Sequence, residues 1–347
     1  MDKVKENKVK DVTIVSLSAG TLGKPSAKHE LQIGLKRLES FGLNVHFSKH
    51  ALMGCDYISN HPESRAEDLM EAFKSDTDMI LCAIGGDDTY RLLPFLFEED
   101  KLKKCVKNKI FLGFSDSTMN HWMLHKVGLN TFYGQSFLAD VCELWDDMLP
   151  YSKSYFSELI ETGTISKIVP SDVWYDARTD FSPSAIGTIT QSHENQGFIS
   201  LQGSDYFEGE ILGGCLDSIY DIFNNERYAD SVELCKKYGL FPEIDDWKNR
   251  ILLLESSEEK PTPEKYRKML TELKNSGVFD VINGVLIGKP QDEVYFEEYK
   301  EILKDVIDNP DLPIVVNLNI GHATPRCIIP FGVHAAVDVS KQEIVFL

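Results

Sequence analysis

The stretch from residue 110 to residue 126 constrains the fold of this chain more than any other. An apolar run over 110–112 reaches a glycine, and Ser115-Asp-Ser-Thr118 then supplies side chains that are typical of a helix N-terminus. An apolar helix face follows at i, i+3, i+4 spacing, formed by Met119, Trp122 and Met123. The pattern predicts a buried parallel strand, a tight turn that carries Ser115, and a helix. In α/β sheets such strand ends are where ligands bind.

Strands and helices alternate along the first 150 residues. Apolar strands are expected at 12–17, 79–84 and 110–113, and amphipathic helices at 29–41 and 65–73. This alternation is typical of a doubly wound parallel sheet. The sequence therefore predicts an α/β domain over residues 1–150.

The pattern changes in the second half of the chain. Residues 151–205 are rich in Ser, Thr, Asp and Pro without a sustained period, so we expect a linker and a loop excursion there. Order returns over 206–347, which we interpret as a second domain. A helix opens at Thr262-Pro263. Strands are expected at 250–254, 282–287, 314–318 and 343–347.

Composition excludes several classes of function. The 347 residues carry 36 Lys and Arg against 55 Asp and Glu, a net charge of -19, which disfavours binding to nucleic acids and anionic membranes. The apolar run after the charged N-terminus is too short for a signal sequence or a membrane span. Seven scattered cysteines without a C-x-x-C pair argue against a disulfide framework and a zinc knuckle. We expect a soluble, cytoplasmic protein.

Three ionisable or nucleophilic side chains share a position at the end of a predicted strand. Ser115 follows 110–113, Glu255 ends the strand at 250–254, and His322 follows the strand at 314–318. A serine nucleophile needs an imidazole base, and a carboxylate fixes the imidazole tautomer. The three residues thus suggest a catalytic triad, although each could instead be a helix cap or an idle surface group.

Other chemistry is compatible with the same stretches. His121 and His125 have a zinc-binding spacing, but their helix lacks the glutamate of H-E-x-x-H, which favours packing histidines. The Gly85-Gly-Asp-Asp-Thr89 loop is similar to a phosphate-binding motif of kinases, and would make the protein a phosphotransferase. A third alternative is a binding protein that sequesters a toxic ligand while its triad is idle.

The sequence resembles the serine LD-carboxypeptidases, peptidase family S66, and within them the microcin C immunity branch. The matching segments keep their order over nearly the whole chain. They are 64–69, 85–89 with 91–94, 113–118, Gly134, 213–216, Leu254-Glu-Ser-Ser-Glu-Glu-Lys-Pro261, Gly321-His322 and 329–332.

The resemblance implies roles for individual residues. Ser115 would be the nucleophile, Glu255 the orienting carboxylate and His322 the general base, with the backbone N–H groups of Gly86 and Asp116 as the oxyanion hole. It also implies a flavodoxin-like N-terminal domain, a C-terminal swivelling-type β/α domain and a site in the cleft between them. Members of this family are usually homodimers and need no metal or other cofactor.

Two substrate classes are compatible with the resemblance. One is a peptidoglycan stem tetrapeptide, the other a microcin C-like aminoacyl-nucleotide. An aromatic side chain discriminates between them, because a nucleobase gains about 1–3 kcal/mol from stacking and a D-alanine gains none. Trp174 and Phe181 in the 151–205 segment are the candidates for substrate contact. We favour the aminoacyl-nucleotide, although these aromatic side chains could equally pack the loop onto the domain.

Overall fold

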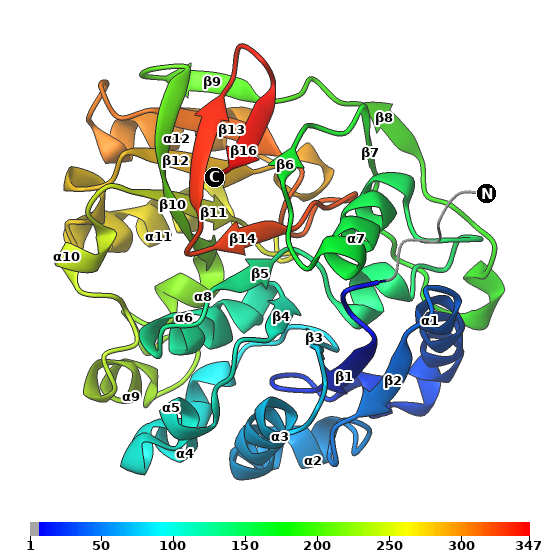
Figure 1. Cartoon of the computed structure of the whole chain (residues 1–347). Helices are drawn as coiled ribbons and strands as arrows, with labels where there is room; N and C mark the ends of the chain where they lie inside the picture. Colours follow the sequence, from blue (N-terminus) through cyan, green and yellow to red (C-terminus); the bar gives the residue numbers. More distant parts are fainter. Residues whose placement is uncertain (1–6) are drawn as a thin grey trace.

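The computed structural model describes residues 7–347, which form two sheets with helices packed around them (Figure 1). The first sheet has six strands in the order β14-β5-β4-β3-β1-β2. Strands β1 to β5 are parallel and follow the flavodoxin order 2-1-3-4-5, while β14 pairs antiparallel with β5. Their bounds are β1 (Asp11–Val15), β2 (Asn44–Phe47), β3 (Met79–Cys82), β4 (Ile110–Gly113), β5 (Thr131–Tyr133) and β14 (Ile329–Phe331).

The second sheet has eight strands in the order β6-β16-β15-β10-β11-β12-β13-β9. Its central strands β10 to β13 are parallel, and the flanking strands pair antiparallel. The bounds are β6 (Lys167–Ile168), β9 (Ile199–Gln202), β10 (Tyr206–Cys215), β11 (Arg250–Glu255), β12 (Gly284–Gly288), β13 (Ile314–Leu318), β15 (His334–Asp338) and β16 (Glu343–Phe346). A parallel-sheet domain and a mixed-sheet domain confirm the predicted two-domain α/β architecture.

The helices lie close to where the apolar periodicity predicts them. The helix expected at 29–41 is α1, the one at 65–73 is α3, and the one after Thr262 is α11. The α-helices are α1 (Lys28–Ser40), α2 (Cys55–Asn60), α3 (Pro62–Lys74), α4 (Leu93–Phe97), α5 (Lys101–Cys105), α6 (Thr118–Lys126), α7 (Pro150–Thr162), α8 (Leu216–Tyr220), α9 (Ser231–Lys237), α10 (Ile244–Trp247), α11 (Pro263–Asn275) and α12 (Phe296–Ile307). No helix within residues 7–347 is both long and apolar enough to cross a membrane.

The segment 151–205 is more regular than the sequence suggested. It contains most of α7 and the short strands β6 and β9, which join opposite edges of the second sheet. It also contains the separate hairpin of β7 (Val173–Tyr175) and β8 (Ser192–Glu194). Strands of two to four residues are too short to show a period, which is why sequence patterning missed them. The domain division at residues 150 and 205 stays an interpretation.

Helix α6 joins the two domains. Residues 118–124 are all buried, because the helix is covered by the first sheet and by the second domain. The indole N–H of Trp122 donates to the carbonyl of Gly213 in β10 (2.8 Å). The backbone N–H of Cys215 donates to Thr118 Oγ1 (2.9 Å). These contacts hold the start of α6, and with it the turn at Ser115, against the carboxyl end of β10.

Candidate active site

Ser115 lies on a strained turn between β4 and α6. Its φ of 61° is unusual for a residue with a Cβ and costs on the order of 1 kcal/mol. The turn is held by two hydrogen bonds: the Ser115 N–H donates to the Tyr133 hydroxyl (3.1 Å), and Thr118 Oγ1 donates to the Ser115 carbonyl (2.7 Å). Strain of this kind is found where a fold presents one side chain in a required direction.

The structure brings Ser115, Glu255 and His322 together. Glu255 is the last residue of β11 and is buried, and His322 lies in the segment that leads from β13 back to the first sheet. His322 Nδ1 donates to Glu255 Oε2 (2.8 Å), and His322 Nε2 lies 3.1 Å from Ser115 Oγ. The carboxyl ends of strands from both sheets therefore meet at one hydrogen-bonded chain of three side chains. This is the order that transfer of a serine proton to an imidazole requires.

A second carboxylate, which sequence reasoning did not single out, also contacts the imidazole. Glu258 Oε2 lies 2.9 Å from His322 Nε2. A carboxylate beside each ring nitrogen favours the imidazolium form of His322. Burial alone would lower the pKa of His322, but Glu255 and Glu258 outweigh burial and raise this pKa above its usual range. The hydrogen bond to His322 in turn lowers the pKa of Glu258 to about 2.

Two further buried residues hold these three side chains in place. The Tyr133 hydroxyl donates to Glu255 Oε1 (2.7 Å), so Tyr133 links the carboxylate to the Ser115 amide. Arg326 donates to the carbonyls of Gly321 and His322 and to Asp140 Oδ1 (2.9 Å). Sequence reasoning missed both; Tyr133 precedes the noted Gly134, and Arg326 follows His322 by four residues.

The Gly85-Gly86 loop after β3 approaches the serine closely. A Cβ added at Gly85 would lie 2.7 Å from the Ser115 Cβ, so only glycine fits there. The Asp116 carboxylate accepts hydrogen bonds from Ser18 Oγ (2.6 Å) and from the Thr89 N–H (2.9 Å), which fixes the loop beside the turn. Within the described chain, neither the Gly86 N–H nor the Asp116 N–H donates a hydrogen bond. These two amides are thus free to bind an oxyanion.

A cavity of about 390 Å³ opens beside His322. Its wall includes side chains from both domains and from the 151–205 segment, among them Lys24, Glu143, Arg178, Phe181, His322 and Arg326. Phe181 is 54% exposed and lines this cavity, whereas Trp174 is 7% exposed and stacks on His193 with ring centroids 4.2 Å apart. Of the two aromatic candidates, Phe181 is the one placed to contact a molecule in the cavity.

The alternative chemistries find little support in the geometry. Both Asp88 oxygens of the Gly85–Thr89 loop are hydrogen bonded to arginines, Oδ1 to Arg65 (2.5 Å) and Oδ2 to Arg91 (3.2 Å), so the carboxylate is not free for a magnesium ion. His121 is buried between Thr131 Oγ1 (2.7 Å) and the Gly113 carbonyl (3.0 Å), and burial lowers its pKa to about 3. It is a packing histidine.

One group of side chains has the spacing of metal ligands. Within residues 7–347, donor atoms of Cys215, Glu255 and His322 lie within 4.8 Å of one another. However, Glu255 and His322 are 2.8 Å apart, closer than the roughly 3.3 Å that separates two ligands of a tetrahedral zinc ion. Burial also raises the pKa of the Cys215 thiol well above its usual value, whereas a metal binds the thiolate. The group fits a hydrogen-bonded site better than a metal centre.

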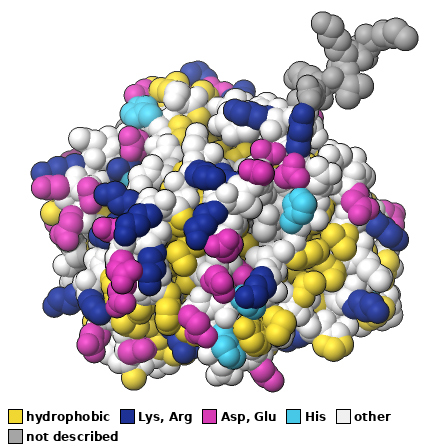
Figure 2. Space-filling view, turned by 60° about the horizontal axis from the view of Figure 1, so that its bottom comes forward, with side chains coloured by type: hydrophobic (Ala, Val, Ile, Leu, Met, Phe, Trp, Pro, Cys, Tyr) yellow, Lys and Arg dark blue, Asp and Glu magenta, His cyan; other side chains and the backbone are white. Residues whose placement is uncertain are grey.

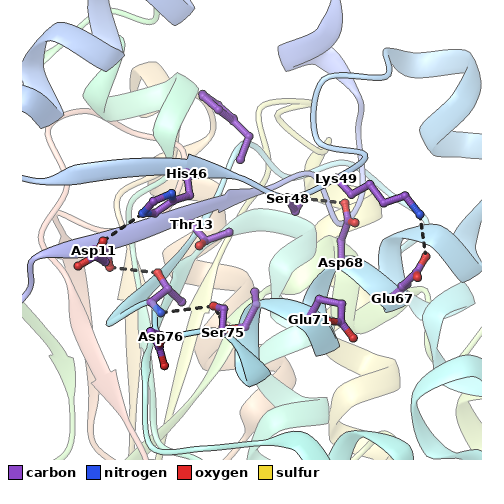
Figure 3. A pocket seen from close by; sticks show the side chains of 13 residues that line it. Asp11, Thr13, His46, Ser48, Lys49, Glu67, Asp68, Glu71, Ser75 and Asp76 are labelled. Atoms are coloured by element: carbon purple, nitrogen blue, oxygen red, sulfur yellow. Dashed lines mark hydrogen bonds and ion pairs between the residues drawn. The ribbon is translucent and has the colours of Figure 1, made fainter.

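A second cavity, of about 510 Å³, lies between β1, β2 and α3, and no triad residue lines it. Its side chains bind one another, as Figure 3 shows: Asp11 pairs with His46 (3.0 Å), Ser48 donates to Asp68 (2.6 Å), and Lys49 faces Glu67 (3.9 Å). Because these polar groups are satisfied internally, the cavity offers no catalytic candidate.

Comparison with known proteins places these residues in a family context. Residues 12–134 match the LD-carboxypeptidase N-terminal domain of peptidase family S66, and residues 208–337 match its C-terminal domain. The chain is 24% identical to the Escherichia coli microcin C7 self-immunity protein MccF (96% of this chain, 92% of that protein). It is 26% identical to a probable murein peptide carboxypeptidase of Bacillus subtilis (92% and 88%).

The crystal structure of an MccF-like protein from Streptococcus pneumoniae in complex with AMP is much more similar. The two chains are 64% identical and superimpose with a TM-score of 0.97, over 98% of this chain and 99% of the other.

Proposed function

Because the chain belongs to the LD-carboxypeptidase family S66 of serine peptidases, we propose that it hydrolyses an amide bond through Ser115, His322 and Glu255. The observation that carries this proposal is the continuous chain of contacts from Ser115 Oγ through His322 to Glu255, with separations of 3.1 and 2.8 Å. The reaction needs a nucleophile, a base and a group that orients the base, and each is present within hydrogen-bonding distance.

Acyl transfer assigns a role to Ser115, His322, Glu255 and the two free amides. Ser115 Oγ attacks the carbonyl carbon while its proton moves to Nε2 of His322, and the amides of Gly86 and Asp116 bind the oxyanion. His322 then gives that proton to the leaving nitrogen as the carbon–nitrogen bond breaks. His322 Nε2 then deprotonates a water molecule, which attacks the Ser115 ester. The acid is released, and His322 returns the proton to Ser115 Oγ. Glu255 holds the imidazole and stabilises its positive charge throughout.

The proposed substrate is an aminoacyl-nucleotide of the microcin C type. Two observations support it: the 64% identical MccF-like protein was solved with AMP, and the cavity beside His322, at about 390 Å³, is of a size that takes a small organic ligand. Phe181 on the cavity wall is proposed to stack on the base. Trp174, the other sequence candidate, is buried against His193 and would have to leave that position to do so.

Replacement of Ser115 tests the reaction. Ser115→Ala should lower kcat about 10⁴-fold or more on aspartyl sulfamoyl adenosine, because the oxyanion hole alone retains only a small part of the catalysis. The thermal unfolding temperature should stay nearly unchanged, since alanine keeps the Cβ and the backbone of the turn and removes only the hydroxyl. Turnover of many equivalents by the native protein would exclude a sequestering role, and undiminished activity of the variant would refute the serine mechanism.

The second candidate substrate is a peptidoglycan L,D-tetrapeptide, favoured by the 26% identity to a probable murein peptide carboxypeptidase. A side-by-side assay of the tetrapeptide and the aspartyl nucleotide compound decides between them. Cleavage of the tetrapeptide alone would replace the proposed substrate while leaving the serine mechanism intact.

A homodimer and a cytoplasmic location also remain predictions. Acidic and basic side chains are interspersed on the face drawn in Figure 2, with patches of hydrophobic side chains between them. Light scattering of the purified protein measures the oligomeric state directly, and a mass of one chain, 39.3 kDa, would refute the dimer.

A further inference from the structure

Glu258 also contacts the nitrogen that the proposed mechanism needs as a base. His322 Nε2 has to accept the Ser115 proton, yet Glu258 Oε2 lies 2.9 Å from it, slightly closer than Ser115 Oγ at 3.1 Å. A carboxylate in this position keeps a proton on Nε2, and a protonated nitrogen cannot act as a base. The contact between Glu258 and His322 must therefore break before Ser115 can be activated.

The Glu258 carboxylate is able to exchange partners. Its side chain is 63% exposed, and among the described residues its ion-pair partner is His322. The next residue, Glu259, is equally exposed at 62% but pairs with Arg227 (3.3 Å). Backbone contacts fix the loop that carries both: the Ser257 N–H donates to Asp217 Oδ2 (3.0 Å). The loop is thus anchored while the Glu258 head group faces solvent beside the reacting atoms.

A substrate cation can take the place of His322⁺ as the partner of this carboxylate. In an aminoacyl compound the free α-ammonium group is two bonds from the carbonyl carbon that Ser115 attacks, so it necessarily lies within a few ångströms of Ser115 Oγ. In a peptidyl substrate the same nitrogen is an uncharged amide. The Glu258 carboxylate therefore lies near the position where an aminoacyl substrate carries a positive charge and a peptidyl substrate carries none.

We propose that Glu258 is a specificity-determining residue that binds the free α-ammonium group of the acyl residue. His322 then loses the carboxylate beside Nε2 and passes its Nε2 proton to solvent, which leaves Nε2 able to accept the Ser115 proton. The proposal rests on the acyl-transfer role proposed above for Ser115. Glu258 thus favours aminoacyl over peptidyl substrates, and it couples recognition of the amine to activation of the base.

A pair of ligands that differ only in the amine tests this. Aspartyl sulfamoyl adenosine and succinyl sulfamoyl adenosine are titrated by calorimetry into the Ser115→Ala protein, which cannot turn them over by the proposed route. The ammonium should improve affinity about 10-fold or more, since one charged pair contributes on this scale. In Ser115→Ala/Glu258→Gln the two ligands should bind equally within about twofold. Ser115→Ala/Glu259→Gln, the matched control, should keep the full preference.

The result separates this inference from the proposed function. An ammonium preference that survives Glu258→Gln, or that is lost equally in Glu259→Gln, overturns the role of Glu258. So does failure of the Ser115→Ala protein to prefer the aspartyl compound. Hydrolysis of the aspartyl compound by the native protein is measured separately: if it proceeds, the serine mechanism stands whatever Glu258 does. Unfolding temperatures of all variants verify that each is folded.

Discussion

Tyr133 offers the sharpest test of how the site is held together, because one hydroxyl serves both domains. It donates to Glu255 Oε1 (2.7 Å) in the second domain and accepts from the Ser115 N–H (3.1 Å) in the first. Burial, reinforced by the Glu255 charge, raises the pKa of Tyr133 well above its usual value, so the hydroxyl stays a donor. Tyr133→Phe removes both hydrogen bonds and almost no volume.

The size of the expected stability loss follows from the two groups that lose their hydrogen bond, the Ser115 N–H and the Glu255 carboxylate. A buried group without a hydrogen bond costs about 1–3 kcal/mol, and more when it is charged, so Tyr133→Phe should lower the free energy of unfolding by roughly 2–4 kcal/mol. The Ser115 turn loses the bond that opposes its strain, and Glu255 loses the donor that orients it. If the transition state loses about 2 kcal/mol of stabilisation as a result, kcat/KM should fall about 30-fold.

Tyr155→Phe is the matched control. Tyr155 is also buried, and its hydroxyl accepts from the backbone N–H of Val169 (3.0 Å), but the residue lies on α7 and contacts no triad member. It should lose stability in urea unfolding while kcat/KM on aspartyl sulfamoyl adenosine stays within about twofold. If Tyr133→Phe keeps native activity, or if Tyr155→Phe loses as much, then the hydroxyl bridge does not position the triad.

Two further predictions concern pH and the cavity. The groups that face the His322 ring are Glu255 and Glu258, with Asp217, Cys215 and Tyr133 around them. Because the two glutamates raise the pKa of His322, kcat/KM should fall as pH decreases. Glu258→Gln removes one of these carboxylates and should therefore move the acid limb of the profile to lower pH. An acid limb that stays in place would contradict the pairing seen here. Phe181→Ala should raise KM for the nucleotide compound about 10- to 100-fold by loss of stacking, leaving any tetrapeptide cleavage unchanged; equal effects on both substrates would argue against stacking.

Local sequence patterns predicted much of the first sheet and of the site. The strands β1, β3 and β4 and the helices α1, α3 and α11 begin and end within a few residues of their predicted bounds, because each has an apolar face that repeats over several turns or residues. The positions of Ser115, Glu255 and His322 at strand ends were also readable, since parallel strands of one sheet present their carboxyl ends at one edge.

Strands too short to show an alternation of apolar and polar residues could not be predicted from the sequence. β6 and β9 have two and four residues, and β14 has three. Such strands are defined by the edge that they join rather than by their own pattern. The segment 151–205 was expected as a linker and loops for this reason, although it supplies an edge strand at each side of the second sheet.

By itself, the sequence determined the two-domain α/β class, the strand–turn–helix at Ser115 and the family, because these depend on residues close together in the chain. Only the tertiary structure decided which partners meet across the domain junction. Tyr133 and Arg326 acquire their roles from contacts with residues 122 and 186 positions away, and Glu258 from its contact with His322. Such contacts are set by the packing of two sheets on α6, and a linear pattern carries no information about a distance between elements that only folding brings together.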